Sequence, residues 1–250
     1  MRQGGLRLNG LTKESKKNKP LISVITVVYN GRDSIEGTIN SVLSQTYENI
    51  EYIVIDGNST DSTIDIIERY GNKIDYWISE SDKGVYHAMN KGIALASGDY
   101  IALLNSGDWY EINTCAIVAE RILLNKADIY YGMVRVYRQD KTLLCIKGNT
   151  IDNISNEMIA HPTCFISSDI YAVQMYNTKY ISAADYDFVL RLKISGYSFS
   201  FIEEIFANFK IGGISSSKVG HRETNRIMHI YKFQSFLSFF LKNIYLTFFK

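Results

Sequence analysis

The sequence predicts an α/β fold, in which helices flank a mostly parallel sheet. Three short apolar runs rich in β-branched residues cover 21–29, 50–55 and 100–104, and Gly, Ser, Asn or Asp follow each of them closely. Such runs are typical of buried parallel strands. Because 46% of the 250 residues are hydrophobic and 21% are charged, the composition is that of a globular chain and excludes a disordered one.

Strands and helices alternate through the first half of the chain. Asp33 is expected to cap the first helix, and Asp61 to cap the second or to place an acid in its first turn. Such alternation gives a mostly parallel sheet wound by right-handed crossovers. The expected strands are 21–29, 50–55, 74–78, 100–104 and 128–137, and the helices between them begin near 33, 61, 85 and 112.

The pattern changes after about residue 140. No internal repeat, low-complexity tract or Pro-rich linker separates the two halves. We therefore expect the second half to form a lid on the same sheet and not a separate domain. Its expected elements are a hairpin strand at 141–146, a short strand at 163–167, a helix at 185–194 and one or two strands at 199–209.

Composition also limits the class of protein. Residues 1–19 carry six basic side chains and a single acidic one, so we expect a polar, mobile leader without the apolar core of a signal peptide. No stretch is long and apolar enough to span a bilayer. The net charge of +1 gives no global electrostatic argument for nucleic-acid binding. Three dispersed cysteines without a CxxC pair argue against disulfides or a zinc site and favour a reducing, cytoplasmic compartment.

Two carboxylates follow predicted strands. Asp56 comes directly after 50–55, and Asp108 follows 100–104 by four residues. Ligands of open α/β sheets bind outside the carboxyl ends of the strands. Both side chains are therefore expected to face one pocket, which suits a nucleotide and a divalent metal.

Seven ordered segments resemble glycosyltransferase family 2, the inverting nucleotide-sugar transferases with the GT-A fold. Transferases that make bacterial exopolysaccharide, O-antigen (lipopolysaccharide) and capsule are the most similar. The resemblance runs from about residue 21 to about residue 216. The segments are 23–30, 56–61, 79–86 with 88–92, 98–99, 104–108, 185–188 and 212–215.

The resemblance implies which residues bind the donor. The acid that matches Asp56 contacts the uracil of the donor in this family, although Asp56 also starts a sequence with good turn chemistry. For Lys83 the residues leave open a contact with the diphosphate or a solvated loop position, and Gly84 lets the backbone come close. The expected donor-binding residues are Val28, Tyr29, Asn30, Asp56, Asn58, Asp82, Lys83, Gly84, Asn105 and Ser106.

Residues 105–108 occupy the place of the family's Asp-x-Asp element, which binds Mg²⁺ or Mn²⁺ beside the donor diphosphate. Asn105 stands where the family has an Asp, and Gly107 occupies another position that is often acidic. Asp108 is then the one carboxylate in this element, and it is the expected metal ligand. We therefore expect weaker metal binding, or help from Asn105 or a histidine, with a turn-capping role for Asp108 as the alternative.

Asp185 is the expected catalytic base. It matches the Asp of the family's Glu-Asp motif, while Ala184 replaces the Glu. In an inverting transfer a carboxylate takes the proton of the attacking acceptor hydroxyl. The alternative, an N-terminal helix cap, is compatible with that role.

Three further residues are weaker candidates for contact with the acceptor or the phosphates: His161, Asp187 and His221. Each has a structural alternative, which for Asp187 is to stabilise the first turn of its helix. Gly212 and Gly213 are expected to mark a flexible loop over the site, with Arg222 within reach of the diphosphate.

The C-terminal residues 231–250 are rich in Phe, Leu, Ile and Tyr. Gln234, Ser238 and Lys242 recur every four residues and give a helix with a narrow polar stripe. Such a helix could lie in a membrane interface, dock on the chain's own sheet or form a homodimer contact. We expect a catalytic domain over 20–216 and a helical tail over 217–250.

The expected function is inverting transfer of a hexosyl or N-acetylhexosaminyl group from a nucleotide-sugar, a UDP-sugar, to a glycan or lipid-linked acceptor. The enzyme is expected in the cytoplasm, peripheral to the inner face of the membrane. Two alternatives stay open. One is an inactive nucleotide- or sugar-binding scaffold protein. The other is a nucleotidyltransferase, although the loop at 29–33 lacks the expected Gly-rich sequence.

Overall fold

The computed structural model describes all residues except 155–157, 213–216, 236–237, 240–241, 243–244 and 247–250. One ten-stranded sheet, with strand order β1-β4-β3-β2-β5-β9-β7-β10-β6 and β8 paired to β7, forms its centre. The strands are β1 (Arg2–Gly4), β2 (Ile22–Val28), β3 (Ile50–Asp56), β4 (Tyr76–Ser79), β5 (Tyr100–Leu103), β6 (Trp109–Tyr110), β7 (Ile129–Tyr137), β8 (Leu143–Lys147), β9 (Phe165–Ser167) and β10 (Phe199–Lys210).

The sheet is mostly parallel, as the sequence predicts. Strands β2, β3, β4, β5, β7 and β10 run in the same direction, because β5 and β7 are both antiparallel to β9 between them. The sheet therefore continues without a break into the second half of the chain.

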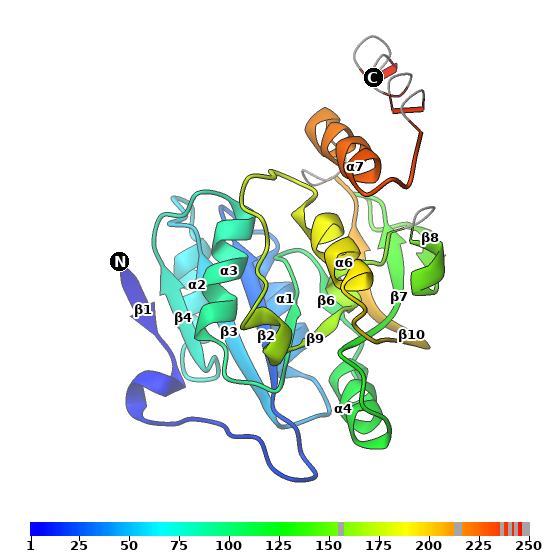
Figure 1. Ribbon diagram of the computed structural model, residues 1–250. Helices are drawn as coiled ribbons and strands as arrows, with labels where there is room; N and C mark the ends of the chain where they lie inside the picture. Colours follow the sequence, from blue (N-terminus) through cyan, green and yellow to red (C-terminus); the bar gives the residue numbers. More distant parts are fainter. Residues whose placement is uncertain (155–157, 213–216, 236–237, 240–241, 243–244, 247–250) are drawn as a thin grey trace.

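Helices cover both faces of the sheet (Figure 1). Alternate residues of β2 enter two apolar clusters: Ile22 and Val24 pack with α1, α2 and α4, whereas Ile25 and Val27 pack with α3, α5 and α6. Burial on both faces explains why the strand reads as a continuous apolar run. The helices are α1 (Ile35–Leu43), α2 (Thr63–Arg69), α3 (Val85–Leu95), α4 (Thr114–Leu124), α5 (Ser168–Tyr171), α6 (Ala184–Ile194) and α7 (Lys218–Ile230), with 3₁₀ turns η1 (Leu6–Asn9), η2 (Ile151–Asn153) and η3 (His161–Thr163).

Most predicted elements are present, with small shifts at their ends. β8 pairs antiparallel with β7 as the expected hairpin, and β10 is one strand rather than two. Asp61 neither caps α2 nor lies in its first turn, because Ser62 is the N-cap residue and Asp65 is the first-turn acid; Asp61 lies just before the helix and accepts a hydrogen bond from the backbone N–H of Thr63 at 3.0 Å. Asp33 does not cap α1: Ser34 is the N-cap residue, and the exposed Asp33 side chain pairs with Arg32.

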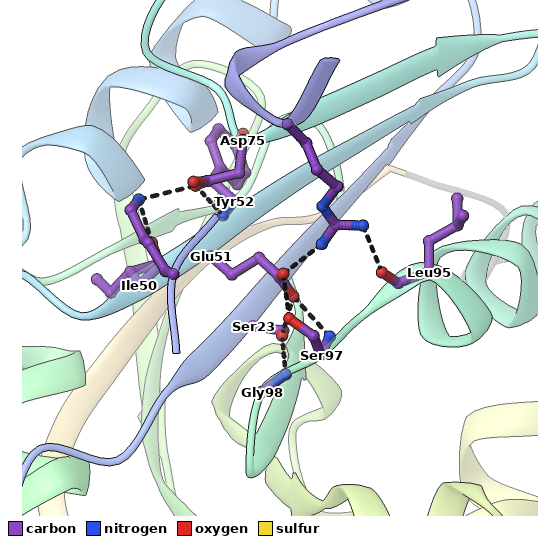
Figure 2. A network of polar contacts seen from close by, with 10 residues as sticks. Ser23, Ile50, Glu51, Tyr52, Asp75, Leu95, Ser97 and Gly98 are labelled. Atoms are coloured by element: carbon purple, nitrogen blue, oxygen red, sulfur yellow. Dashed lines mark hydrogen bonds and ion pairs between the residues drawn. The ribbon is translucent and has the colours of Figure 1, made fainter. Parts of the chain in front are cut away.

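The leader at residues 1–19 is not a mobile segment, which corrects the sequence expectation. Strand β1 pairs with β4 at the edge of the sheet. Arg7 forms an ion pair with Glu51, and Lys13 Nζ lies 2.8 Å from Asp75 Oδ2 (Figure 2). Both carboxylates are only 3% exposed. Buried carboxylates require partners, and two basic residues of the leader supply them.

The helical tail expected over 217–250 begins with α7, whereas much of the striped helix expected at 231–250 lies outside the described residues. Helix α7 packs against α6, and its residue Ile227 is fully buried. The helix ends before Lys232, which has a left-handed φ of 62°. In the described part of the segment beyond it, the Phe239 ring stacks on His229 with centroids 4.5 Å apart. That part therefore contacts α7. None of the described helices is long and apolar enough to cross a membrane.

Candidate functional site

The carboxyl ends of β2, β3 and β4 form one rim. A Cβ atom placed on Gly57 would lie 2.7 Å from Asp82 Oδ2 and 3.4 Å from Tyr29 Cδ2, so the three residues meet with no room for a side chain at the middle one. The Tyr29 side chain is 65% exposed. An exposed aromatic ring beside a carboxylate at the ends of parallel strands is suited to bind a small ligand.

Asp56 lies beneath this rim and not on its surface. Its side chain is fully buried, and both carboxylate oxygens accept hydrogen bonds from within the chain. Ser79 Oγ donates at 2.6 Å and the Ser59 backbone N–H at 3.0 Å, while Ser59 Oγ donates to the other oxygen at 2.5 Å. This is the turn role that the sequence left open for Asp56. Direct contact of its carboxylate with a base stays a prediction.

The loops that follow β2 and β3 each contain an asparagine with a left-handed backbone, and Asn30 joins the two loops. Asn30 and Asn58 have φ values of 51° and 65°. Asn30 Oδ1 accepts the Thr60 N–H at 2.9 Å, and the Asn30 N–H donates to Ser59 Oγ at 2.7 Å. The two loops therefore hold each other in place. Val28 is buried and contributes through its backbone carbonyl, which accepts the Gly57 N–H at 2.9 Å.

The loop after β4 leads directly into α3. Asp82 Oδ1 accepts the backbone N–H of Gly84 at 2.7 Å, and Lys83 between them is exposed. Gly84 has a φ of 114°, a value that glycine adopts readily, and it is the N-cap residue of α3. The start of this helix therefore lies at the same rim as Asp82.

The turn at 105–108 is anchored to α1. The Ser106 and Ser34 hydroxyl oxygens lie 2.9 Å apart, and the Gly107 N–H donates to Thr38 Oγ1 at 3.0 Å. Asp108 is only 6% exposed, and the Lys210 N–H lies 3.5 Å from its carboxylate. Burial raises the pKa of Asp108 from 3.8 to about 7, because the one hydrogen bond offsets little of the lost hydration.

The turn supplies few metal ligands. Within the described residues, no three His, Cys, Asp or Glu side chains cluster as a metal site. Asp108 offers a carboxylate, and Asn105 offers an amide oxygen that is buried without a partner in the described part of the chain. Both are hard oxygen donors, and Mg²⁺ is commonly bound by one or two carboxylates together with substrate phosphates. The turn therefore fits a cation that takes its other ligands from a diphosphate and water.

Asp185 lies in the first turn of α6 and is half-buried. The N-cap residue is Ala183, so Asp185 is not the helix cap. Its Oδ1 accepts a hydrogen bond from the Tyr86 hydroxyl at 3.0 Å. Burial and the Asp185 charge raise the pKa of Tyr86, which therefore stays protonated and donates.

Aromatic side chains surround this carboxylate. Tyr86 stacks on Tyr176 at 5.8 Å between ring centroids, and His161 meets Tyr176 edge-on at 6.1 Å. Burial lowers the pKa of His161 against the opposing effect of Asp185. His161 Nε2 is buried and has no hydrogen-bond partner among the described residues. Tyr86 lies within the segment 79–86 that resembles the family, whereas no local pattern marks Tyr176.

Asp187 and His221 are placed elsewhere. The Asp187 carboxylate is buried, accepts Arg191 Nε at 2.9 Å and the Tyr231 hydroxyl at 3.0 Å, and so has the structural role. His221 borders a groove whose other lining residues come from α7 and the tail. Asp185, Tyr86, Tyr176 and His161 together form what we call the Asp185 cluster. The structure therefore brings neither Asp187 nor His221 to this cluster.

Helix α3 connects the two parts of the site. Gly84 at its start belongs to the rim, and Tyr86 two residues later donates to Asp185. Gly213, from the loop expected over the site, lies outside the described residues. The arrangement places a ligand rim and a half-buried carboxylate near the same helix N-terminus.

Comparison with known proteins agrees with this architecture. The family model described as "Glycosyl transferase family 2" matches residues 23–187. An uncharacterized glycosyltransferase of Mycobacterium tuberculosis is 31% identical over 215 residues, which are 83% of this chain and 80% of that protein. TuaG of Bacillus subtilis, named for teichuronic acid biosynthesis, is 47% identical over 94 residues, which are 36% of this chain and 37% of TuaG.

Solved structures show the same fold. Staphylococcus aureus TarS 1–349 in complex with UDP-GlcNAc has a TM-score of 0.69 at 18% identity, over 84% of this chain and 65% of that one. The mannosyltransferase PcManGT of Pyrobaculum calidifontis, in complex with GDP-Man and Mn²⁺, has a TM-score of 0.65 at 15% identity, over 92% and 71%. These similarities confirm the GT-A fold.

Proposed function

The chain belongs to glycosyl transferase family 2 and is a glycosyltransferase, and from that premise we propose its reaction. It moves a sugar from a UDP-sugar to a hydroxyl of a glycan or lipid-linked acceptor in the synthesis of a bacterial surface polysaccharide. Support for this class of substrates comes from the similarity to TuaG, named for teichuronic acid biosynthesis, and to TarS, whose structure holds UDP-GlcNAc.

The observation that carries the proposal is the environment of Asp185. Its carboxylate is half-buried among aromatic rings, has Tyr86 as a donor, and lies near the start of α3, where the rim also ends. In the proposed inverting reaction the acceptor hydroxyl attacks the anomeric carbon from the face opposite the diphosphate. Asp185 takes the hydroxyl proton as the new C–O bond forms and the bond to the diphosphate oxygen breaks.

The rim holds the donor in this proposal. Tyr29 offers its exposed ring to the base, and Asp82 and the backbone around Gly84 lie where the sugar-diphosphate would pass. Lys83 is exposed beside them and can place a positive charge near the phosphates. A bound Mg²⁺ or Mn²⁺ would be held by Asp108 and Asn105 and would supply charge to the leaving diphosphate.

A thermal-shift panel tests the donor site. UDP, GDP, CMP, dTDP and ADP are added with and without Mn²⁺, because a ligand that binds the native state raises its stability by mass action. We expect UDP to give the largest shift and Mn²⁺ to increase it. The sugar is then identified by UDP release from individual UDP-sugars. No response to any nucleotide would contradict the proposal.

An inactive nucleotide-binding scaffold is the second candidate. The small number of possible metal ligands at Asp108 favours a scaffold, since the described residues contain no cluster of metal-binding side chains. A scaffold would bind UDP without consuming any UDP-sugar. Consumption of the sugar nucleotide with release of UDP would exclude it.

A further inference from the structure

The segment that enters α6 is held by a carboxylate from α7. Glu223 accepts three successive backbone N–H groups: Ile181 at 2.8 Å, Ser182 at 2.8 Å and Ala183 at 3.1 Å. Hydrogen bonds from N–H groups to a carboxylate are stronger than neutral ones. Three of them fix the backbone immediately before Asp185.

The helix has no cap of its own at this point. The N-cap residue Ala183 has no side chain that can accept a hydrogen bond, and Ser182 Oγ is buried without a partner in the described part of the chain. Helix N-termini leave backbone N–H groups without partners and favour a negative charge nearby. The Glu223 carboxylate, 40 residues away, supplies that charge.

Helix α7 and Tyr231, which follows it, also contact the chain on the C-terminal side of Asp185. The Tyr231 hydroxyl donates to Asp187 at 3.0 Å, and Ile227 is fully buried in the apolar cluster that includes α6. Figure 1 shows α7 next to α6. Asp185 therefore lies between two points, residues 181–183 and Asp187, that α7 and Tyr231 fix.

We propose that Glu223 is a positioning residue, which sets the orientation of Asp185 toward the acceptor hydroxyl and makes α7 part of the active site. This inference rests on the proposed function, in which Asp185 is the base. Glu223 touches no reacting atom in this scheme. Its effect passes through the backbone of residues 181–183, and α7 lies beyond the residues that the family model matches.

The expected consequence is a loss in kcat with little change in the KM for the donor. The rim is built from the ends of β2, β3 and β4, which Glu223 does not contact. A displacement of about 1 Å in a catalytic group costs about 10²-fold in rate. We expect Glu223→Ala to lower kcat by about this factor, and Glu223→Asp, which keeps the charge, to recover part of it.

The test measures UDP released from UDP-GlcNAc, UDP-glucose or UDP-galactose, whichever the wild-type enzyme consumes fastest. Hydrogen exchange over residues 181–186 is measured in parallel, and UDP binding is followed by thermal shift. Glu203→Ala, at an exposed position on β10, is the matched control. Tyr231→Phe removes one hydroxyl and provides a mild second variant if Glu223→Ala does not fold.

The outcomes separate the two proposals. Faster exchange at 181–186, lower kcat and unchanged UDP binding in Glu223→Ala or Tyr231→Phe, with no change in Glu203→Ala, support the inference. Wild-type kcat in the Glu223 variants, while Asp185→Asn is inactive, overturns the positioning role and leaves the base in place. An Asp185→Asn variant with full turnover, or a wild-type enzyme that consumes no UDP-sugar, overturns the proposed function and this inference together.

Discussion

The rim, which is the proposed donor side, and the surroundings of Asp185, which are the proposed acceptor side, are built in different ways. On the donor side, Asn30 joins the loop after β2 to Thr60 in the loop after β3, and the loop after β4 is closed on itself by the hydrogen bond from Gly84 to Asp82. On the acceptor side, Asp185 contacts Tyr86, which is 99 residues earlier, and its helix is held by Glu223. The first arrangement follows from the sheet topology, whereas the second depends on contacts between distant segments.

The two carboxylates differ in the same way. Asp108 is almost completely buried with one long hydrogen bond, and its pKa is raised to about 7. Asp185 is half-buried and accepts a tyrosine hydroxyl. Groups whose environments differ so much are suited to different tasks. In the proposed reaction Asp108 binds a cation and Asp185 takes a proton.

The largest effect is expected at the acceptor side. Asp185→Asn keeps the shape of the side chain and removes its ability to take a proton, so turnover should fall about 10²- to 10⁴-fold. The thermal shift produced by UDP should not change, because Asp185 takes no part in the hydrogen bonds that hold the rim loops. Steady-state UDP release and the thermal shift measure the two quantities separately. Near wild-type turnover would remove Asp185 as the base and end the contrast between the two sides.

A smaller effect, dependent on pH, is expected at the donor side. Mn²⁺ must displace the proton from Asp108, whose pKa is about 7. The Mn²⁺ enhancement of the UDP-induced thermal shift should therefore weaken as the pH falls from about 8 to about 6. Asp108→Asn should lose the enhancement at both pH values. An enhancement that is independent of pH, or that Asp108→Asn retains, would show that the cation is bound elsewhere.

The raised pKa of Asp108 also affects the stability of the protein when no metal is bound. The folded state keeps Asp108 protonated up to about pH 7, whereas the ordinary value is 3.8. Between these values the folded state binds more protons, so the Asp108 contribution makes the free energy of unfolding fall as the pH rises. Asp108→Asn should remove that part of the decrease, which denaturant unfolding at several pH values measures.

Much of the donor side could be predicted from the sequence because buried parallel strands are local patterns. The runs that become β2, β3 and β5 predicted the sheet, and the residues after β2 and β3 predicted part of the rim. Glu223 and Tyr231 were missed because hydrogen bonds between distant segments leave no periodic pattern. The docking of residues 1–19 on the sheet was missed for a related reason. A basic segment is expected to be solvated unless its carboxylate partners are known.

One signal for the leader was present. Glu51 lies inside the apolar run 50–55, and a carboxylate within a fully buried strand needs a cation or several donors. Ser23, Ser97 and Arg7 supply them (Figure 2). The sequence cannot say which of the chain's basic residues provides the cation, because that choice depends on where the leader docks.

The smallest effect on turnover is expected from Arg7→Ala, which acts at the opposite end of the strands from the rim. It leaves Glu51, 3% exposed, with its serine and backbone donors but without a cation. Loss of one partner of a buried ion pair costs about 3 kcal/mol, so the free energy of unfolding should fall by about that amount. Arg2→Ala is the matched control, since its ion pair with Glu68 is exposed and is worth less than about 1 kcal/mol.

Well below the unfolding transition, UDP release should equal that of the wild type, because Arg7 contacts neither the rim nor the Asp185 cluster. A fall in kcat without a fall in stability would mean that residues 1–19 affect the site itself. The rim and the surroundings of Asp185 would then both depend on this segment, which the contrast between them does not predict.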